Sequence, residues 1–169
     1  MKLFLEEKFF SLWGGSYNVY HEDRSVAYTV QGQPSLVRRK LTICDAQGNE
    51  AGMLQTKIIS FFPAYTIWKN GQEIGKVQKK FSLFTPKFEV NFKDWHVEGN
   101  LMGWNYKIYD RQDQIVAAID QQIWNFTEHF VIDCDNDADA LDVLMLTLAI
   151  SAMRKDQEEN TSTSSSGND

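Results

Sequence analysis

The chain has 169 residues, of which 43% are hydrophobic and 13% aromatic, and its formal net charge is −6. This length suits a single domain, and the hydrophobic share excludes a disordered chain. The acidic balance gives no reason to expect a nucleic-acid-binding protein, which would present a strongly basic face.

The charge is unevenly distributed along the chain. Residues 1–127 include fifteen basic and thirteen acidic residues, whereas residues 128–169 include two basic and ten acidic ones. The first part of the chain is therefore slightly positive, and the C-terminal end is strongly negative.

Three features predict the compartment. The N-terminal stretch MKLFLEEKFF lacks the apolar core of a signal peptide, because Glu6, Glu7 and Lys8 interrupt it. Cys44 and Cys134 have no metal-ligand spacing and cannot form a disulfide framework, which is typical of a reducing compartment. The longest uncharged apolar run, residues 143–153, is shorter than the roughly 20 residues that a membrane-spanning helix needs. We expect a cytoplasmic protein whose association with a membrane would be peripheral.

A short motif recurs along most of the chain: an aromatic residue or Leu, any residue, then Val or Ile. It occurs six times, with starts 24, 24, 23, 18 and 24 residues apart, at Tyr17/Val19, Leu41/Ile43, Tyr65/Ile67, Phe88/Val90, Tyr106/Ile108 and Phe130/Ile132. Such regular spacing suggests a structural repeat. The first five motifs are followed by the turn-like stretches HEDRS, DAQGNE, KNGQE, KD and DRQDQ and then by a second apolar segment. This alternation predicts consecutive β-hairpins, with Asn70-Gly71 as the strongest turn signal.

The hairpins define the fold class. With a first strand at Leu3–Phe10 and a last strand at Phe126–Asp133, the sequence predicts about twelve antiparallel strands. Open sheets of this size tend to curl or split, so the pattern favours a closed barrel or a sandwich.

The segment after the last strand decides between the two. It changes to helical composition behind the N-cap candidates Asp135, Asn136 and Asp137, and it is apolar on nearly every face between Leu141 and Met153. Such a helix must be buried on all sides, and the lumen of a twelve-stranded barrel is wide enough to hold it. We therefore expect one mainly β domain over residues 1–155, a closed barrel around a helix at about 137–154, and a disordered polar tail at 156–169.

These residues resemble a known family. The stretch KLTICDAQGNEAGMLQTKIISFFPAYTIWKNGQEIGKVQKKFSLFTPKFEV, followed by WHVEGN, YKIYD and the terminal apolar helix, is similar to the LURP-one-related family of the tubby C-terminal-like superfamily, which includes the phospholipid scramblases. The resemblance covers roughly Lys2–Met153. It implies the same twelve-stranded barrel threaded by a hydrophobic helix. It also implies an association with lipids, because tubby proteins bind phosphoinositides and tether to membranes, and scramblase-like members associate with lipid and calcium.

Four predicted strand ends are rich in aromatic residues: Lys8–Trp13, Lys57–Pro63, Lys80–Pro86 and Gln122–Phe126. If consecutive strands alternate in direction, all four lie at one end of the barrel. Their aromatic side chains either dip into a membrane interface or cap the barrel core. The residues concerned are Trp13, Phe61, Phe62, Phe84 and Trp124.

Basic residues concentrate in the middle of the chain, at Arg38, Arg39, Lys40, Lys76, Lys79, Lys80 and Lys87. Anionic lipid headgroups or other phosphates suit such a cluster. Strand alternation places Lys79 and Lys80 on opposite faces, so the set cannot form one site in full. The alternative is a solvated face that protects strand edges and keeps the protein soluble.

No metal, cofactor or catalytic residue is predicted. The acidic segment Asp133–Asp139 suggests calcium, but an EF-hand loop starting there would have Ala138 at its glycine position and Leu144 at its glutamate position. Helix capping and the helix dipole account for these acids. The histidines, His21, His96 and His129, belong to no catalytic motif.

The sequence thus favours a non-enzymatic intracellular binding module that recognises anionic phospholipid headgroups or phosphorylated ligands. The alternative is a protein–protein interaction scaffold that uses the polar tail. An enzyme or ligand carrier is the third hypothesis, and the helix argues against it by filling the lumen.

Overall fold

The computed structural model describes residues 1–6, 15–33, 38–57, 64–80, 87–101, 103–124 and 127–164. Within these ranges, only the backbone is described for residues 38, 57, 79, 80, 87, 123, 124, 127–129 and 155–164. The described chain forms twelve strands, one short 3₁₀ helix and one α-helix. The strands are β1 (Lys2–Glu6), β2 (Ser16–Tyr20), β3 (Val26–Gln33), β4 (Arg38–Asp45), β5 (Glu50–Lys57), β6 (Ala64–Lys69), β7 (Gln72–Lys80), β8 (Lys87–Phe92), β9 (His96–Asn100), β10 (Asn105–Tyr109), β11 (Ile115–Trp124) and β12 (Thr127–Cys134).

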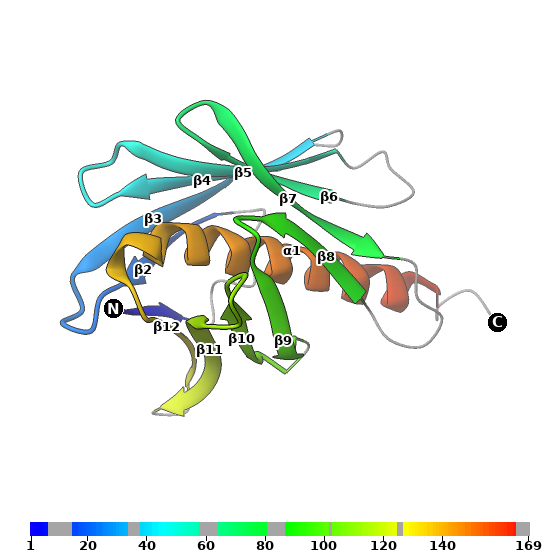
Figure 1. Cartoon of the computed structure of the whole chain (residues 1–169). Helices are drawn as coiled ribbons and strands as arrows, with labels where there is room; N and C mark the ends of the chain where they lie inside the picture. Colours follow the sequence, from blue (N-terminus) through cyan, green and yellow to red (C-terminus); the bar gives the residue numbers. More distant parts are fainter. Residues whose placement is uncertain are drawn as a thin grey trace.

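All twelve strands belong to one antiparallel sheet that curls around the helix (Figure 1). The first strand pairs with the last, so that Lys2 lies opposite Asp133 and Leu5 lies opposite Phe130. Each other strand pairs with its neighbour along the chain, except that β8 and β9 do not pair and form the two edges of the sheet. The predicted fold is confirmed, with one correction: the barrel is nearly closed rather than fully closed.

The turn between β8 and β9 explains the opening. Lys93 and Asp94 have positive φ angles of 52° and 55°, and the Trp95 amide donates a hydrogen bond to the Phe92 carbonyl at 2.9 Å. The Trp95 ring packs edge-on against the Phe92 ring, with centroids 5.4 Å apart. This tight turn sends β9 away from β8 instead of back along it, as Figure 1 shows.

The recurring sequence motif lies on the inner side of the strands. Leu41, Ile43, Tyr65 and Ile67 are fully buried, and most other motif residues are buried too. In four of the six motifs, the register shifts directly after the Val or Ile, at residues 19/20, 43/44, 67/68 and 108/109. A β-bulge at this point increases the local twist and bend of the strand, as curling into a barrel requires.

The lumen is filled by α1 (Ala140–Ser164), which follows the 3₁₀ helix η2 (Asp137–Asp139). The side chain of Asn136 caps η2 by accepting a hydrogen bond from the Ala138 amide at 3.0 Å. Most side chains from Val143 to Ile150 are completely buried on every face of the helix, which is the burial that its composition predicts.

The helix is longer than the sequence suggested. It continues to Ser164, whereas we expected it to end near residue 154 and to be followed by a polar tail from residue 156. The residues just after Arg154 include Lys, Gln and Glu, which are good helix formers, so the helix propagates beyond the buried part. Residues 165–169 lie outside the described part of the chain.

The two ends of the barrel differ, and we name them for the path of the helix. At the entry rim, the even-numbered strands end, the odd-numbered strands begin, and α1 enters. At the exit rim, the odd-numbered strands end and the even-numbered strands begin. Met145 lies against Gly52 near the entry rim, and Arg154 lies over Trp104 near the exit rim. The helix therefore runs through the lumen from one rim to the other.

Candidate functional site

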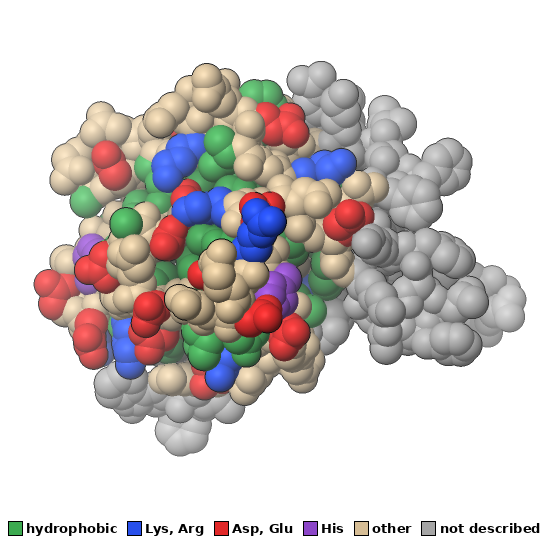
Figure 2. Space-filling model, viewed as in Figure 1, with side chains coloured by type: hydrophobic (Ala, Val, Ile, Leu, Met, Phe, Trp, Pro, Cys, Tyr) green, Lys and Arg blue, Asp and Glu red, His purple; other side chains and the backbone are tan. Residues whose placement is uncertain are grey.

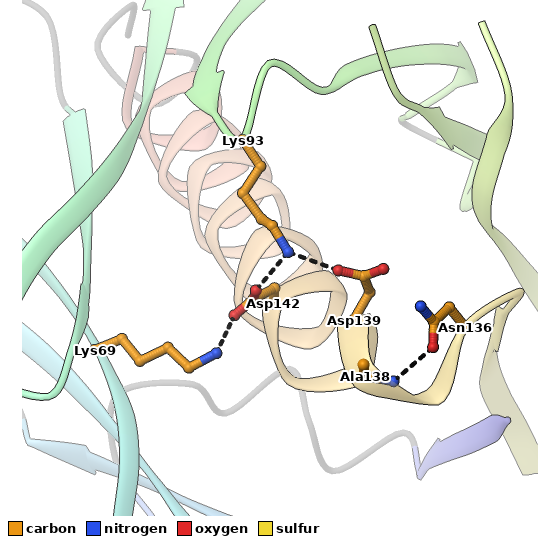
Figure 3. A network of polar contacts seen from close by, with 6 residues as sticks. All are labelled: Lys69, Lys93, Asn136, Ala138, Asp139 and Asp142. Carbon is orange, nitrogen blue, oxygen red and sulfur yellow. Dashed lines mark hydrogen bonds and ion pairs between the residues drawn. The ribbon is translucent and has the colours of Figure 1, made fainter. Parts of the chain in front are cut away.

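A network of charged side chains fixes the start of α1 at the entry rim (Figure 3). The Asp142 side chain, only 8% exposed, accepts hydrogen bonds from the Nζ atoms of Lys69 and Lys93, each at 2.8 Å. Lys93 also contacts Asp139 at 2.6 Å. Lys69 ends β6 and Lys93 lies in the β8–β9 turn, so the network ties two parts of the sheet to the first turn of the helix.

The chemistry of this network is structural. Partial burial of Lys93 lowers its pKa, but the hydrogen bonds and charges of Asp139 and Asp142 outweigh that effect, and the pKa is raised overall. Lys93 therefore stays protonated, and its ammonium lies 4.7 Å from the centre of the Trp95 ring. A lysine that acts as a base or forms a Schiff base needs a lowered pKa instead.

The acidic segment predicted as a calcium alternative is engaged with cations. Asp133 lies 3.5 Å from the Lys2 Nζ atom, Asp137 lies 2.9 Å from the Met1 amino group, and Asp139 contacts Lys93. Among the described residues, no group of three or more His, Cys, Asp or Glu side chains could hold a metal ion. Acids at the start of a helix also interact favourably with its dipole.

The thiols and the histidine that the structure describes in most detail show no activation. Both cysteines are buried, and burial raises the pKa of Cys134 to about 11, which keeps the thiol protonated and weakly nucleophilic. His96 stacks on Tyr109 and lies 3.5 Å from Asp113, with 43% of its side chain exposed. These groups offer contacts at the surface rather than a nucleophile with an adjacent base.

A second charged region lies on the outer face of β4–β8. The register aligns Lys40, Gln55, Thr66, Lys76 and Asn91 in one row across the five strands. These positions alternate with fully buried residues such as Leu41 and Val77, so they belong to the outer face of the barrel.

Closer to the exit rim, the register pairs like charges. Arg38 lies directly opposite Lys57, and Lys80 lies directly opposite Lys87. Neighbouring strands are about 4.8 Å apart, so each pair brings two cationic residues to adjacent backbone positions. Like charges in directly opposed positions are destabilising by themselves. We call these six residues the basic wall: Arg38, Lys40, Lys57, Lys76, Lys80 and Lys87.

The register sorts the basic residues predicted from the sequence. Arg38, Lys40, Lys76, Lys80 and Lys87 are brought together on the outer face of adjacent strands. Arg39 and Lys79 occupy the alternate positions, which share a strand face with the buried Leu41 and Val77, so they leave the set.

Lys57 was missed as a member of this set. The sequence showed it only as the first residue of an aromatic-rich strand end, and its position opposite Arg38 follows from the β4–β5 hairpin register. The signal was present in the turn DAQGNE, where Gly48 adopts a φ of 85°. A hairpin turn of known position fixes which residues of its two strands face each other.

The aromatic strand ends remain a prediction. Trp13, Phe61, Phe62 and Phe84 lie outside the described residues, and for Trp124 only the backbone is described. The strands that flank all four segments begin or end at the exit rim, as the expected alternation requires.

The two rims differ in charge. The turns at the entry rim carry many acidic residues, and Figure 2 shows Asp and Glu side chains crowded around that rim, at the left of the view. The basic wall extends toward the opposite rim. Among the described helical residues, no stretch has both the length and the apolar character needed to cross a bilayer.

A nearly closed antiparallel barrel of twelve strands, threaded by one C-terminal helix and carrying no activated nucleophile among the described groups discussed above, defines a class of small barrel proteins rather than an enzyme active site. The model of the LURP-one-related family matches residues 1–151, and the chain belongs to that family.

Two individual proteins are similar to it. The protein YxjI of Bacillus subtilis (strain 168) is 23% identical over 138 residues, which cover 81% of this chain and 85% of YxjI. The X-ray structure of a protein from Arabidopsis thaliana superposes with a TM-score of 0.53 at 11% identity, covering 86% of this chain and 89% of that one. The second similarity concerns the fold alone, and neither description names a ligand or a reaction.

Proposed function

We propose that this protein is a non-enzymatic binding module whose basic wall recognises phosphate-bearing anions, with phospholipid headgroups at a membrane surface as the favoured ligand. The observation that carries the proposal is the register, which gathers six cationic residues on one outer face and opposes two pairs of like charge. Within the aligned rows, the acidic residue is Glu89, opposite Gln78.

The physical reason is charge compensation. Two cationic side chains in opposed strand positions repel each other, and a phosphate group between them turns this cost into an attraction. The wall covers three strand intervals between Lys40 and Lys76, about 15 Å, so it can contact several headgroups at once. Each basic residue close to an anionic membrane surface contributes roughly 1 kcal/mol to its attraction.

The interior supports an outer site. The side chains of α1 fill the lumen from Val143 to Met153, so the space in which other barrels hold ligands is occupied by the protein itself. A ligand must therefore bind on the outside of the barrel.

Co-sedimentation with vesicles tests the proposal. The purified protein is mixed with neutral phosphatidylcholine vesicles and with vesicles that also contain anionic lipid, at low salt and at about 150 mM salt, where screening acts within roughly 8 Å. We expect binding to anionic vesicles alone, weakened by salt. The variant Lys40→Glu/Lys76→Glu/Lys80→Glu should lose most of this binding.

A matched control separates the wall from net charge. The variant Lys2→Glu/Lys107→Glu/Arg111→Glu changes the net charge equally but alters residues of β1, β10 and the following turn. It should retain most of the binding. Equal loss in both variants would reject a localised wall, and the absence of binding by the unmodified protein under every condition would reject the lipid ligand.

A protein-interaction scaffold is the second candidate function. The observation that favours it is the pair of sheet edges, β8 and β9, whose outward backbone groups are not paired within the sheet. Such edges can accept a strand from a partner. Partner capture with and without residues 156–169 tests the contribution of the C-terminal segment, and identical sets of captured proteins would dismiss it.

A further inference from the structure

The helix is longer than the barrel that surrounds it. With 25 residues, α1 spans about 37 Å. An eight-residue strand such as β5, tilted as barrel strands are, covers roughly 20 Å of barrel height. Because α1 starts at the entry rim, its C-terminal part projects beyond the exit rim, where Figure 1 shows it extending past the strands.

The projecting part carries negative charge. Asp156, Glu158 and Glu159 follow Lys155, and the last turn of the helix contains no basic residue. Acidic residues in the C-terminal half of a helix add to the negative end of its dipole, which cations stabilise. This arrangement is unfavourable unless positive charge is close by.

The basic wall supplies positive charge at this place. Inside the lumen, α1 lies against β5, β6 and β7 as well as β12. At the exit rim, β5 ends at Lys57, β7 ends at Lys80, and β8 begins at Lys87. The acidic part of the helix therefore leaves the barrel beside the strand ends that carry the opposed like-charge pairs.

We propose that the helical extension Asp156–Glu159 is an intrachain counter-charge that competes with anionic ligands for the exit-rim end of the basic wall. The ligand class rests on the proposed function above, whereas the intrachain contact does not. A tethered competitor acts at a high effective concentration, so a single phosphate displaces it poorly. A membrane surface offers many phosphates at once, so the extension would restrict binding to densely charged surfaces.

The test compares three forms of the full-length protein. The extension variant is Asp156→Asn/Glu158→Gln/Glu159→Gln. The control variant, Glu22→Gln/Asp113→Asn/Asp135→Asn, removes three exposed charges at the entry rim. Both raise the net charge from −6 to −3, so a difference between them reports position rather than total charge.

The first measurement needs no ligand. Acetylation of single lysines is followed by mass spectrometry, with the exposed Lys107 of β10 as the reference. Nearby carboxylates hold a lysine in its unreactive protonated form. In the extension variant we expect Lys57, Lys80 and Lys87 to react at least about twofold faster, and in the control variant at the original rate.

The second measurement is co-sedimentation with anionic vesicles. The extension variant should bind about three- to tenfold more tightly than the control variant, with the difference shrinking at high salt. Unchanged lysine reactivity in the extension variant would overturn the inference, as would equal vesicle binding by the two variants when both bind. Faster acetylation without vesicle binding by any form would uphold the intrachain contact and reject lipid as the ligand of the wall.

Discussion

Asp142 shows how one buried carboxylate is stabilised at the end of a helix. Burial alone disfavours its charged form, and three features offset this: the start of α1, with its positive dipole end, and the ammonium groups of Lys69 and Lys93. The two lysines lie 73 and 49 residues before it in the sequence. The contacts of a single acid thus join β6, the β8–β9 turn and the helix.

Replacing this acid should destabilise the fold. In Asp142→Asn the two ammonium groups lose their shared carboxylate, but their side chains are 33% and 37% exposed and regain part of their hydration. We expect a loss of about 1–3 kcal/mol in the free energy of unfolding by urea. The exposed Asp94→Asn is the control and should stay within about 0.5 kcal/mol of the original protein. An equally small effect at Asp142 would contradict the role of the network.

Lys93 gives a pH dependence of known sign. Its pKa in the folded protein is raised above the ordinary 10.5, so folding strengthens proton binding. Its contribution to stability is complete below pH 10.5 and is lost as the pH rises through the folded pKa.

The comparison with Lys93→Met isolates this contribution. The difference in unfolding free energy between the two proteins should be constant at about pH 7–9 and should shrink above pH 10.5. Any backbone effect of the substitution at a positive φ adds only a pH-independent offset. Lys107→Met serves as the control, since that exposed lysine has no carboxylate partner described here. A difference that grows with pH would show that the sign is wrong.

At the scale of elements, α1 takes the place that a second sheet or a ligand has in other β proteins. Leu144, Leu146 and Leu148 lie on different sides of the helix, and all three are fully buried. The helix thus packs against the sheet around most of its circumference. Its burial explains why the sequence has no polar helix face between residues 143 and 150 except Thr147.

A charge in the middle of this helix should prevent folding. Leu146→Asp buries a carboxylate with no cationic partner among the described neighbours, at a cost of several kcal/mol, comparable to the whole stability of a domain. We expect no soluble protein with a cooperative thermal transition. Leu146→Met keeps volume and polarity and should cost less than about 1.5 kcal/mol. A folded, cooperatively melting Leu146→Asp protein would contradict the buried position of the helix.

At the scale of the whole molecule, the sequence predicted the features that local signals encode. The alternation in Tyr65–Ile67, the turn at Asn70-Gly71 and the uniformly apolar 143–153 segment each act within a few residues. They were sufficient for the number of strands, their antiparallel order and the enclosed helix.

What the sequence did not reveal depends on distant contacts. The opening between β8 and β9 results from left-handed Lys93 and Asp94, residue types that carry no strong turn preference of that kind in Lys, and from the packing of Trp95 on Phe92. The network around Asp142 joins three segments that only the assembled barrel brings together. The composition of the basic wall required the register of five strands, which alternation alone does not provide.

The position of α1 after all twelve strands has a consequence for biosynthesis. The strands leave the ribosome before the segment that fills them, and β1 waits longest because its partner β12 is among the last to emerge. During that time the nascent chain exposes the apolar inner face that carries Leu41, Ile43 and Ile67. Cotranslational folding can form single hairpins, but the barrel becomes complete only after synthesis of the helix, so the growing chain depends on chaperones for longer than a protein whose core forms early.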